Sequence, residues 1–208
     1  MMGRKIATLI MFGSMLLAAG CAGSFRSPRY YSLSIAPELK TDSNSNPRPV
    51  TIGVRQFETP LYLRQGRIVY REHPEQVGFY AYHRWASDPG TQVTTAVVDS
   101  LRSSHSVSFV EPYESHRRAD YLLSGRLERL DELDYGGEVT VEAKVSAELI
   151  NSRTGAVVWA GDASKTAKVE GKDVNSVVTD MSHALSDSVN QLLSEMVQKL
   201  PGAEVSSR

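Results

Sequence analysis

The sequence predicts an α+β fold in which a mostly antiparallel sheet is covered on one face by two amphipathic helices, within a single domain. Three observations lead to this prediction. Residues 121–163 largely alternate apolar and polar side chains, as strands with one buried face do. Residues 89–103 and 173–199 each repeat apolar side chains every three or four positions, as helices with one buried face do. Packing these apolar faces together removes them from water.

The chain begins with a segment typical of secretion. Arg4 and Lys5 precede an apolar run, Ile6–Ala19, which is shorter than the roughly 20 residues of a membrane-spanning helix. The run ends in the letters LAAGC, which resemble a bacterial lipobox, although Ala18 replaces the usual leucine. We therefore predict cleavage before Cys21 and lipidation of Cys21. The alternative is an ordinary secretion signal with an incidental cysteine.

These features divide the chain into four parts. We expect a lipoprotein signal peptide at 1–20, a lipid-anchored tether at 21–29, a folded domain at 30–200 and a disordered tail at 201–208. A domain of this length buries a sufficient core without disulfides, and Cys21 is the single cysteine. Without the two basic residues of the signal, 21 basic residues face 24 acidic ones. This mild acidity argues against a nucleic-acid partner.

The first half of the domain is predicted to contain five strands and one helix. Runs of aromatic and β-branched residues predict strands at 30–36, 50–57, 67–71, 77–83 and 106–110. Polar, turn-forming residues predict loops at 37–49 and 112–118. Helix 89–103 is expected to begin at a Ser87 or Asp88 cap, with Pro89 in its first turn.

The second half is predicted to be a β-meander followed by a long helix. The alternation from Tyr121 shifts phase at Leu130 and Leu133, which indicates a bulge or a strand end. A hairpin turn is expected at 135–137, then a strand at 139–149, and then a strand in which alternate residues from Val157 to Ala163 face inward. Helix 173–199 should be roughly 40 Å long. Its apolar stripe comprises Val177, Met181, Leu185, Val189, Leu192, Met196 and Leu200.

No catalytic, cofactor-binding or metal-binding constellation is visible in the sequence. The five histidines do not show a metal-ligand spacing, and the chain has no nucleophile elbow, P-loop or dinucleotide fingerprint. The pair Glu72-His73 is interpreted as a solvated loop. Acidic residues at 128, 131, 132 and 134 lack the calcium-loop pattern and are interpreted as a solvated strand end. The sequence therefore predicts a protein that is not an enzyme and that needs no cofactor.

Aromatic side chains are concentrated between residues 62 and 85. Because neighbours on a strand face opposite sides, Phe79 and the pair Tyr80/Tyr82 cannot all face the core. Exposed aromatic clusters mark protein or lipid contacts. The candidate contact residues are Tyr62, Tyr80, Tyr82 and Trp85. The alternative is that most of them line the core under the helices.

Several motifs resemble the ABC-type transport auxiliary lipoproteins, a PqiC-like family. After the lipobox cysteine they are YYSL (30–33), VTIGV (50–54), RIVYR (67–71), YHRWASDP (82–89), DYLLSGRL (120–127) and TGAVVW (154–159). The resemblance implies a non-catalytic outer-membrane lipoprotein facing the periplasm, which serves an Mce-type lipid transport system. Ala22 agrees with outer-membrane sorting, because the inner-membrane retention signal of enterobacteria is Asp at that place.

The first functional hypothesis is a subunit that docks or caps the periplasm-spanning Mce-domain protein of an ABC-type lipid transporter at the outer membrane. A homo-oligomer is a further option for its assembly. The alternative hypothesis is a direct periplasmic phospholipid-binding carrier, with acyl chains between helices and sheet. An envelope hydrolase is the third, although no catalytic constellation supports it.

Overall fold

The computed structural model describes residues 26–36, 39, 47–114, 118–171 and 173–200. The predicted signal peptide, Cys21 and the predicted tail at 201–208 therefore lie outside the described residues. The described chain confirms the α+β prediction: one eight-stranded sheet, with its long ladders antiparallel, and two α-helices in a single domain. None of its helices has both the length and the apolar character needed to cross a membrane.

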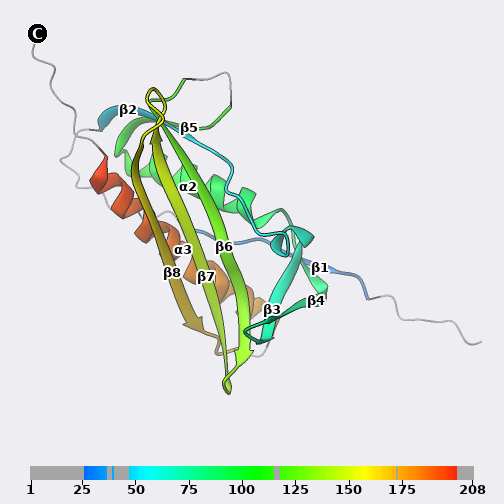
Figure 1. Ribbon diagram of the computed structural model, residues 1–208. Coiled ribbons are helices and arrows are strands. Elements are labelled where there is room, and N and C mark those ends of the chain that lie inside the picture. The colour runs from blue at the N-terminus through cyan, green and yellow to red at the C-terminus, as the bar shows by residue number, and fades with distance from the viewer. Residues whose placement is uncertain (1–25, 37–38, 40–46, 115–117, 172, 201–208) are drawn as a thin grey trace, which may run out of the picture.

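Three long strands dominate the sheet. β6 (Tyr121–Tyr135), β7 (Glu138–Asn151) and β8 (Val157–Lys168) pair antiparallel over nearly their whole lengths (Figure 1). The register of β6 against β7 shifts between Leu127 and Arg129, which is the predicted change of phase. The hairpin between them turns at Gly136 and Gly137, with φ of 81° and 89°, a region that favours glycine.

The other edge of β6 carries two groups of shorter strands. Near its start it pairs in parallel with β2 (Arg48–Val54), which also pairs in parallel with β5 (Val107–Pro112). Near its end β6 pairs in parallel with β3 (Arg67–His73). β4 (Gln76–Trp85) is antiparallel to β3, and β1 (Arg29–Tyr31) is parallel to β4. The sequence predicts these strands but not their parallel pairing, because alternation does not specify a strand's neighbour.

Both helices lie on the same face of the sheet (Figure 1). In α2 (Pro89–Ser104), the Asp88 carboxylate caps the first turn by accepting a hydrogen bond from the Thr91 N–H. In α3 (Val174–Lys199), Asp173 accepts from the N–H groups of Asn175 and Ser176. Every residue of the predicted apolar stripe of α3 is buried. The two helix predictions are therefore confirmed to within a residue at each end.

Three strand predictions need correction. The strand predicted at 30–36 ends at Tyr31, because the chain then leaves the sheet and runs across both helices. The strand predicted at 50–57 ends at Val54, although residues 55–58 stay bonded to β6 through their backbone. Val157 was expected to face inward, but a register shift places it opposite Ile150, and it is 54% exposed.

Candidate functional site

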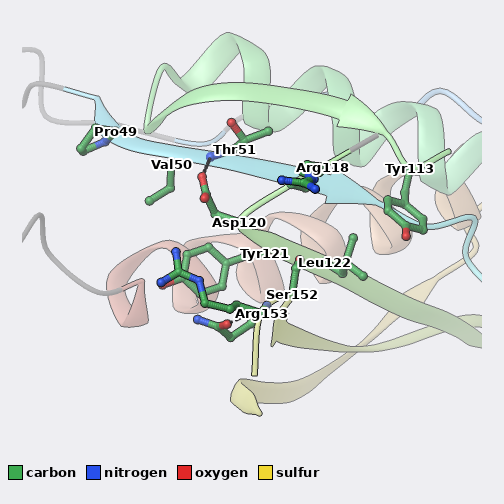
Figure 2. Close-up of a pocket in the computed structure, with 12 residues that line it drawn as sticks. Pro49, Val50, Thr51, Tyr113, Arg118, Asp120, Tyr121, Leu122, Ser152 and Arg153 are labelled. Carbon is green, nitrogen blue, oxygen red and sulfur yellow. Dashed lines mark hydrogen bonds between the residues drawn. The ribbon is translucent and has the colours of Figure 1, made fainter. Parts of the chain in front are cut away.

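A groove opens where β2 and β6 begin and where β7 turns into β8. It has a volume of about 690 Å³, and Figure 2 shows the side chains that line it. The exposed residues Arg118 and Arg153 bring two positive charges to it. Asp120 lies in the same groove and accepts a 2.8 Å hydrogen bond from the Thr51 N–H. The Asp120 carboxylate would repel an anionic ligand bound by the two arginines. The groove by itself therefore does not indicate a ligand.

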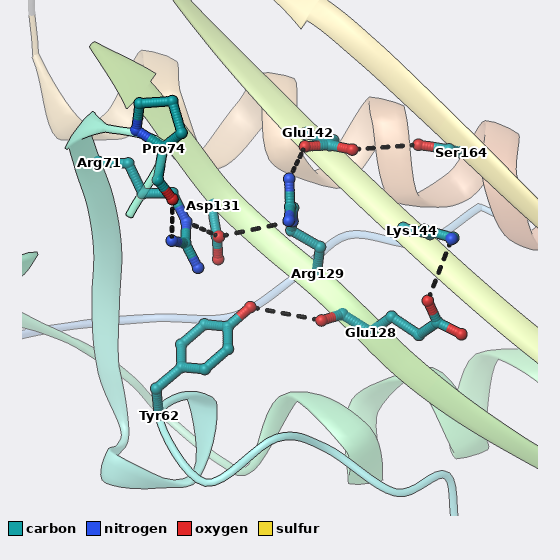
Figure 3. A network of polar contacts seen from close by, with 9 residues as sticks. All are labelled: Tyr62, Arg71, Pro74, Glu128, Arg129, Asp131, Glu142, Lys144 and Ser164. Carbon is teal, nitrogen blue, oxygen red and sulfur yellow. Dashed lines mark hydrogen bonds and ion pairs between the residues drawn. The ribbon is translucent and has the colours of Figure 1, made fainter. Parts of the chain in front are cut away.

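A buried ion pair lies on the sheet face opposite the helices (Figure 3). Asp131 on β6 is fully buried, and its Oδ2 accepts a 2.6 Å hydrogen bond from Arg71 Nε on β3. Arg129 Nε lies 3.9 Å from the same oxygen, and Arg129 also bonds Glu142 on β7 at 2.7 Å. The ring of Tyr62 covers the Arg71 guanidinium, with 5.6 Å between the guanidinium carbon and the ring centroid. This cluster fixes the loop before β3 against the centre of the sheet.

The surroundings of this pair shift two pKa values. Burial, together with the Asp131 charge, raises the pKa of Tyr62 to about 12, so its hydroxyl stays protonated. Burial opposes the charged form of Arg71, but its hydrogen bond to Asp131 and the charge of that carboxylate raise the pKa of Arg71 overall. Neither Tyr62 nor Arg71 is therefore suited to act as a general base near neutral pH.

A second cluster is a row of aromatic rings on β1, β3 and β4. The rings of Tyr70 and Tyr80 meet edge to face with centroids 5.2 Å apart, and Tyr80 meets His83 at 5.5 Å. His83 Nδ1 in turn is hydrogen-bonded to the Tyr31 hydroxyl at 2.8 Å. The Tyr80 hydroxyl donates to Glu132 at 2.8 Å, and burial raises the pKa of that carboxyl. Burial and the Arg29 charge lower the pKa of His83.

The segment that follows β1 lies across both helices, and we call residues 32–36 the strap. Its backbone is bonded by helix side chains rather than by a neighbouring strand. Gln92 of α2 accepts from the Leu33 N–H at 2.7 Å. Ser182 and Ser186 of α3 accept from the N–H groups of Ser34 and Ala36, each at 3.2 Å. The strap therefore connects the N-terminal segment to the helix layer.

The four candidate contact residues have different environments. Tyr82 is 45% exposed, whereas Trp85 is only 4% exposed and belongs to the core. Tyr62 and Tyr80 are half-buried, and their hydroxyls donate to Glu128 O and to Glu132. Tyr82 is thus the most exposed of the four candidate contact residues. The lipidation residue, Cys21, lies outside the described residues.

Sequence reasoning missed two features of these clusters. Asp131 and Glu132, interpreted as part of a solvated strand end, are 0% and 5% exposed. Their burial depends on Arg71 and Tyr80, which are more than 50 residues away in the chain, so no local pattern could have revealed it. Within the described residues, no three His, Cys, Asp or Glu side chains are placed to hold a metal ion.

Comparisons with known proteins agree over most of the fold. The family model described as "ABC-type transport auxiliary lipoprotein component" matches residues 31–193. A search of curated proteins finds no match. A solved protein of Xanthomonas campestris, described as DUF330, is 18% identical with a TM-score of 0.73, over 82% of this chain and 95% of its own. A hypothetical protein of Chlamydia trachomatis is 8% identical with a TM-score of 0.53, over 73% of this chain and 97% of its own. At these identities the two structures show the fold alone.

Proposed function

The chain belongs to the ABC-type transport auxiliary lipoprotein component family, and from that premise we propose that it is a non-catalytic subunit of an Mce-type lipid transport system. In this role it docks or caps the periplasm-spanning Mce-domain protein at the outer membrane. The observation that carries the proposal is the extent of the match: residues 31–193 run from β1 into the last turns of α3. The match therefore supports an auxiliary role for the folded domain as a whole.

The proposed mechanism is attachment without chemistry. A diacylated and N-acylated Cys21 would hold the protein stably, since several acyl chains achieve what one cannot. The eight residues from Ala22 to Arg29 span at most ~29 Å, so the start of the fold stays close to the bilayer. The strap then transmits this position to α2 and α3 through its bonds to Gln92, Ser182 and Ser186. The rest of the surface is presented to the Mce protein at a fixed height.

Co-purification tests the partner. The full chain with a C-terminal tag is expressed in its own host, extracted in mild detergent and captured, and the bound proteins are identified by mass spectrometry. We expect an Mce-domain protein. The matched control carries residues 1–29 of this chain on an unrelated periplasmic domain, and it should capture none. Intact lipoprotein recovered repeatedly without an Mce protein would contradict the proposal.

Membrane fractionation tests the anchor independently. Wild-type protein should be found with the outer membrane, and Cys21→Ser should lose that location because no thiol is available for acylation. A Cys21→Ser variant that remains in the outer-membrane fraction and supports transport as before would refute lipid anchoring. It would leave the question of the partner to the capture experiment.

A further inference from the structure

Two arginines that have no carboxylate partner among the described residues lie opposite each other on β3 and β4, next to β1, the strand that follows the tether. The register of β1 on β4 places Tyr30 opposite Arg84, and the register of β3 on β4 places Arg67 opposite the same Arg84. Directly opposed residues share a face of the sheet, so the three side chains form one cross-strand row. Like charges in directly opposed positions destabilise a sheet. Within the described chain, neither Arg67 nor Arg84 forms an ion pair with a carboxylate.

Exposed aromatic side chains lie on β1 and β4, and an exposed leucine lies in the loop that leads to β3. Tyr30 is 64% exposed and Tyr82 45% exposed, on the two strands that the row crosses first. Leu61, at 80% exposed, lies just before the short helix η2 (Leu63–Gln65). The Trp85 N–H donates to Gly66 O at 2.9 Å, so η2 is tied to the end of β4. Figure 1 shows β1, the end of β4 and η2 together. We call Tyr30, Leu61, Arg67, Tyr82 and Arg84 the basic-aromatic patch.

The position of the patch in the chain limits what can cover it. Arg29 begins β1, and the proposed acylated cysteine lies eight residues earlier. Eight extended residues reach ~29 Å at most, so the start of β1, next to Tyr30, remains within that distance of the lipid surface. A bilayer with anionic headgroups attracts arginines, and tyrosine is a side chain that favours the membrane interface. The positive charge, the tyrosines and the short tether therefore all favour an anionic lipid surface as the binding partner of the patch.

We propose that the basic-aromatic patch rests on the anionic phospholipid surface of the membrane to which the protein is anchored. Lipid phosphates neutralise Arg67 and Arg84, and Tyr30, Tyr82 and Leu61 enter the headgroup region. The patch thereby orients the fold, whereas the lipid anchor alone would only hold it nearby. This inference rests on the proposed anchoring at Cys21 for its geometry, but the contact can be measured without that anchor.

Vesicle sedimentation tests the contact. A chain that begins at Ala22 keeps every described residue of the fold and carries no acyl group. We expect it to bind phosphatidylcholine vesicles that contain phosphatidylglycerol, to lose this binding in high salt, and to bind pure phosphatidylcholine vesicles far less. Arg67→Gln and Arg84→Gln should each weaken the binding about fivefold, the contribution of one basic residue near such a surface. Arg153→Gln, in the β7–β8 turn, is the matched control and should bind as the wild type does.

The same variants separate this contact from a structural role. Removing one of two opposed arginines should leave the free energy of unfolding unchanged or raise it. Equal binding to both kinds of vesicle, or unweakened binding by Arg67→Gln/Arg84→Gln, would overturn the proposal. So would competition by soluble glycerol phosphate at the same affinity, which would indicate a free ligand. Loss of Mce capture with unchanged vesicle binding would assign the patch to the protein partner, and would leave the proposed function standing.

Discussion

At the scale of single residues, Asp131 is the counter-ion of the buried Arg71 guanidinium. It is fully buried beside Arg71, whose side chain is only 11% exposed. Asp131→Asn should lower the free energy of unfolding by about 3 kcal/mol, because it leaves a buried guanidinium without a counter-ion. Arg126→Ala, which breaks the exposed pair with Glu58, should cost less than about 1 kcal/mol. Urea denaturation measures both, and equal losses would show that Asp131 is not effectively buried.

Glu132, the next residue along β6, predicts that the stability of the fold depends on pH. Burial raises the pKa of Glu132 above its ordinary 4.5, so the unfolded chain loses this proton at a lower pH than the folded protein. The free energy of unfolding should therefore fall as the pH rises upward from about 4.5 through the raised pKa. Glu132→Gln keeps an acceptor for Tyr80 without the charge. The variant should therefore be more stable than the wild type at neutral pH, and this part of its profile should be flatter.

Denaturation midpoints measured from acidic to neutral pH provide the comparison for Glu132. Glu148→Gln, an exposed position on the same sheet, controls for the loss of one carboxylate. If the Glu132→Gln profile runs parallel to that of the wild type, ionisation of Glu132 does not oppose folding.

At the scale of secondary-structure elements, the strap is held on α3 by the side chains of Ser182 and Ser186. Ser186 Oγ accepts from the Ala36 N–H, whereas Ser188 Oγ, on the same helix, donates to Ala143 O of β7 at 3.1 Å. Ser186→Ala should accelerate hydrogen exchange in the strap about fivefold, corresponding to one lost hydrogen bond of about 1 kcal/mol. Ser188→Ala should lower global stability by a similar amount without selectively exposing the strap. Hydrogen-exchange mass spectrometry separates the two effects.

The elements also show which parts of the fold and site a sequence specifies locally. Helix α3 could be predicted because its cap, its apolar stripe and its end lie within one continuous segment. The strap could not be, because its backbone partners belong to helices that begin about 60 and 140 residues later. The same limit applies to the candidate site. An aromatic cluster is visible in the sequence, but only the folded chain shows that Tyr82 is exposed and Trp85 is buried. Likewise, only the pairing of β3 with β4 places Arg67 opposite Arg84.

At the scale of the whole molecule, the packing between helices and sheet bears on the alternative of a lipid carrier. Side chains with no more than 2% exposure occupy this layer, among them Phe57, Ile52, Leu123, Leu127, Leu149, Met181, Leu185 and Leu192. The roughly 690 Å³ groove lies at the end of the sheet, outside the layer between helices and sheet, and Arg118, Asp120 and Arg153 place charged groups among its apolar lining residues. Charged groups in the lining do not suit acyl chains. A carrier would have to separate α3 from β7 and β8, and so expose much of this core.

Native mass spectrometry tests this argument directly. The chain that begins at Ala22, purified from cells and washed in high salt to remove headgroups held only by charge, should show the mass of the polypeptide alone. Bound phospholipid that survives the wash would contradict this expectation, because it would require an opening between helices and sheet. Leu185→Ala provides a matched test of the same layer: it creates a cavity under α3 and should cost about 3 kcal/mol of stability. Retention of a lipid by that variant but not by the wild type would show that intact packing is what excludes acyl chains.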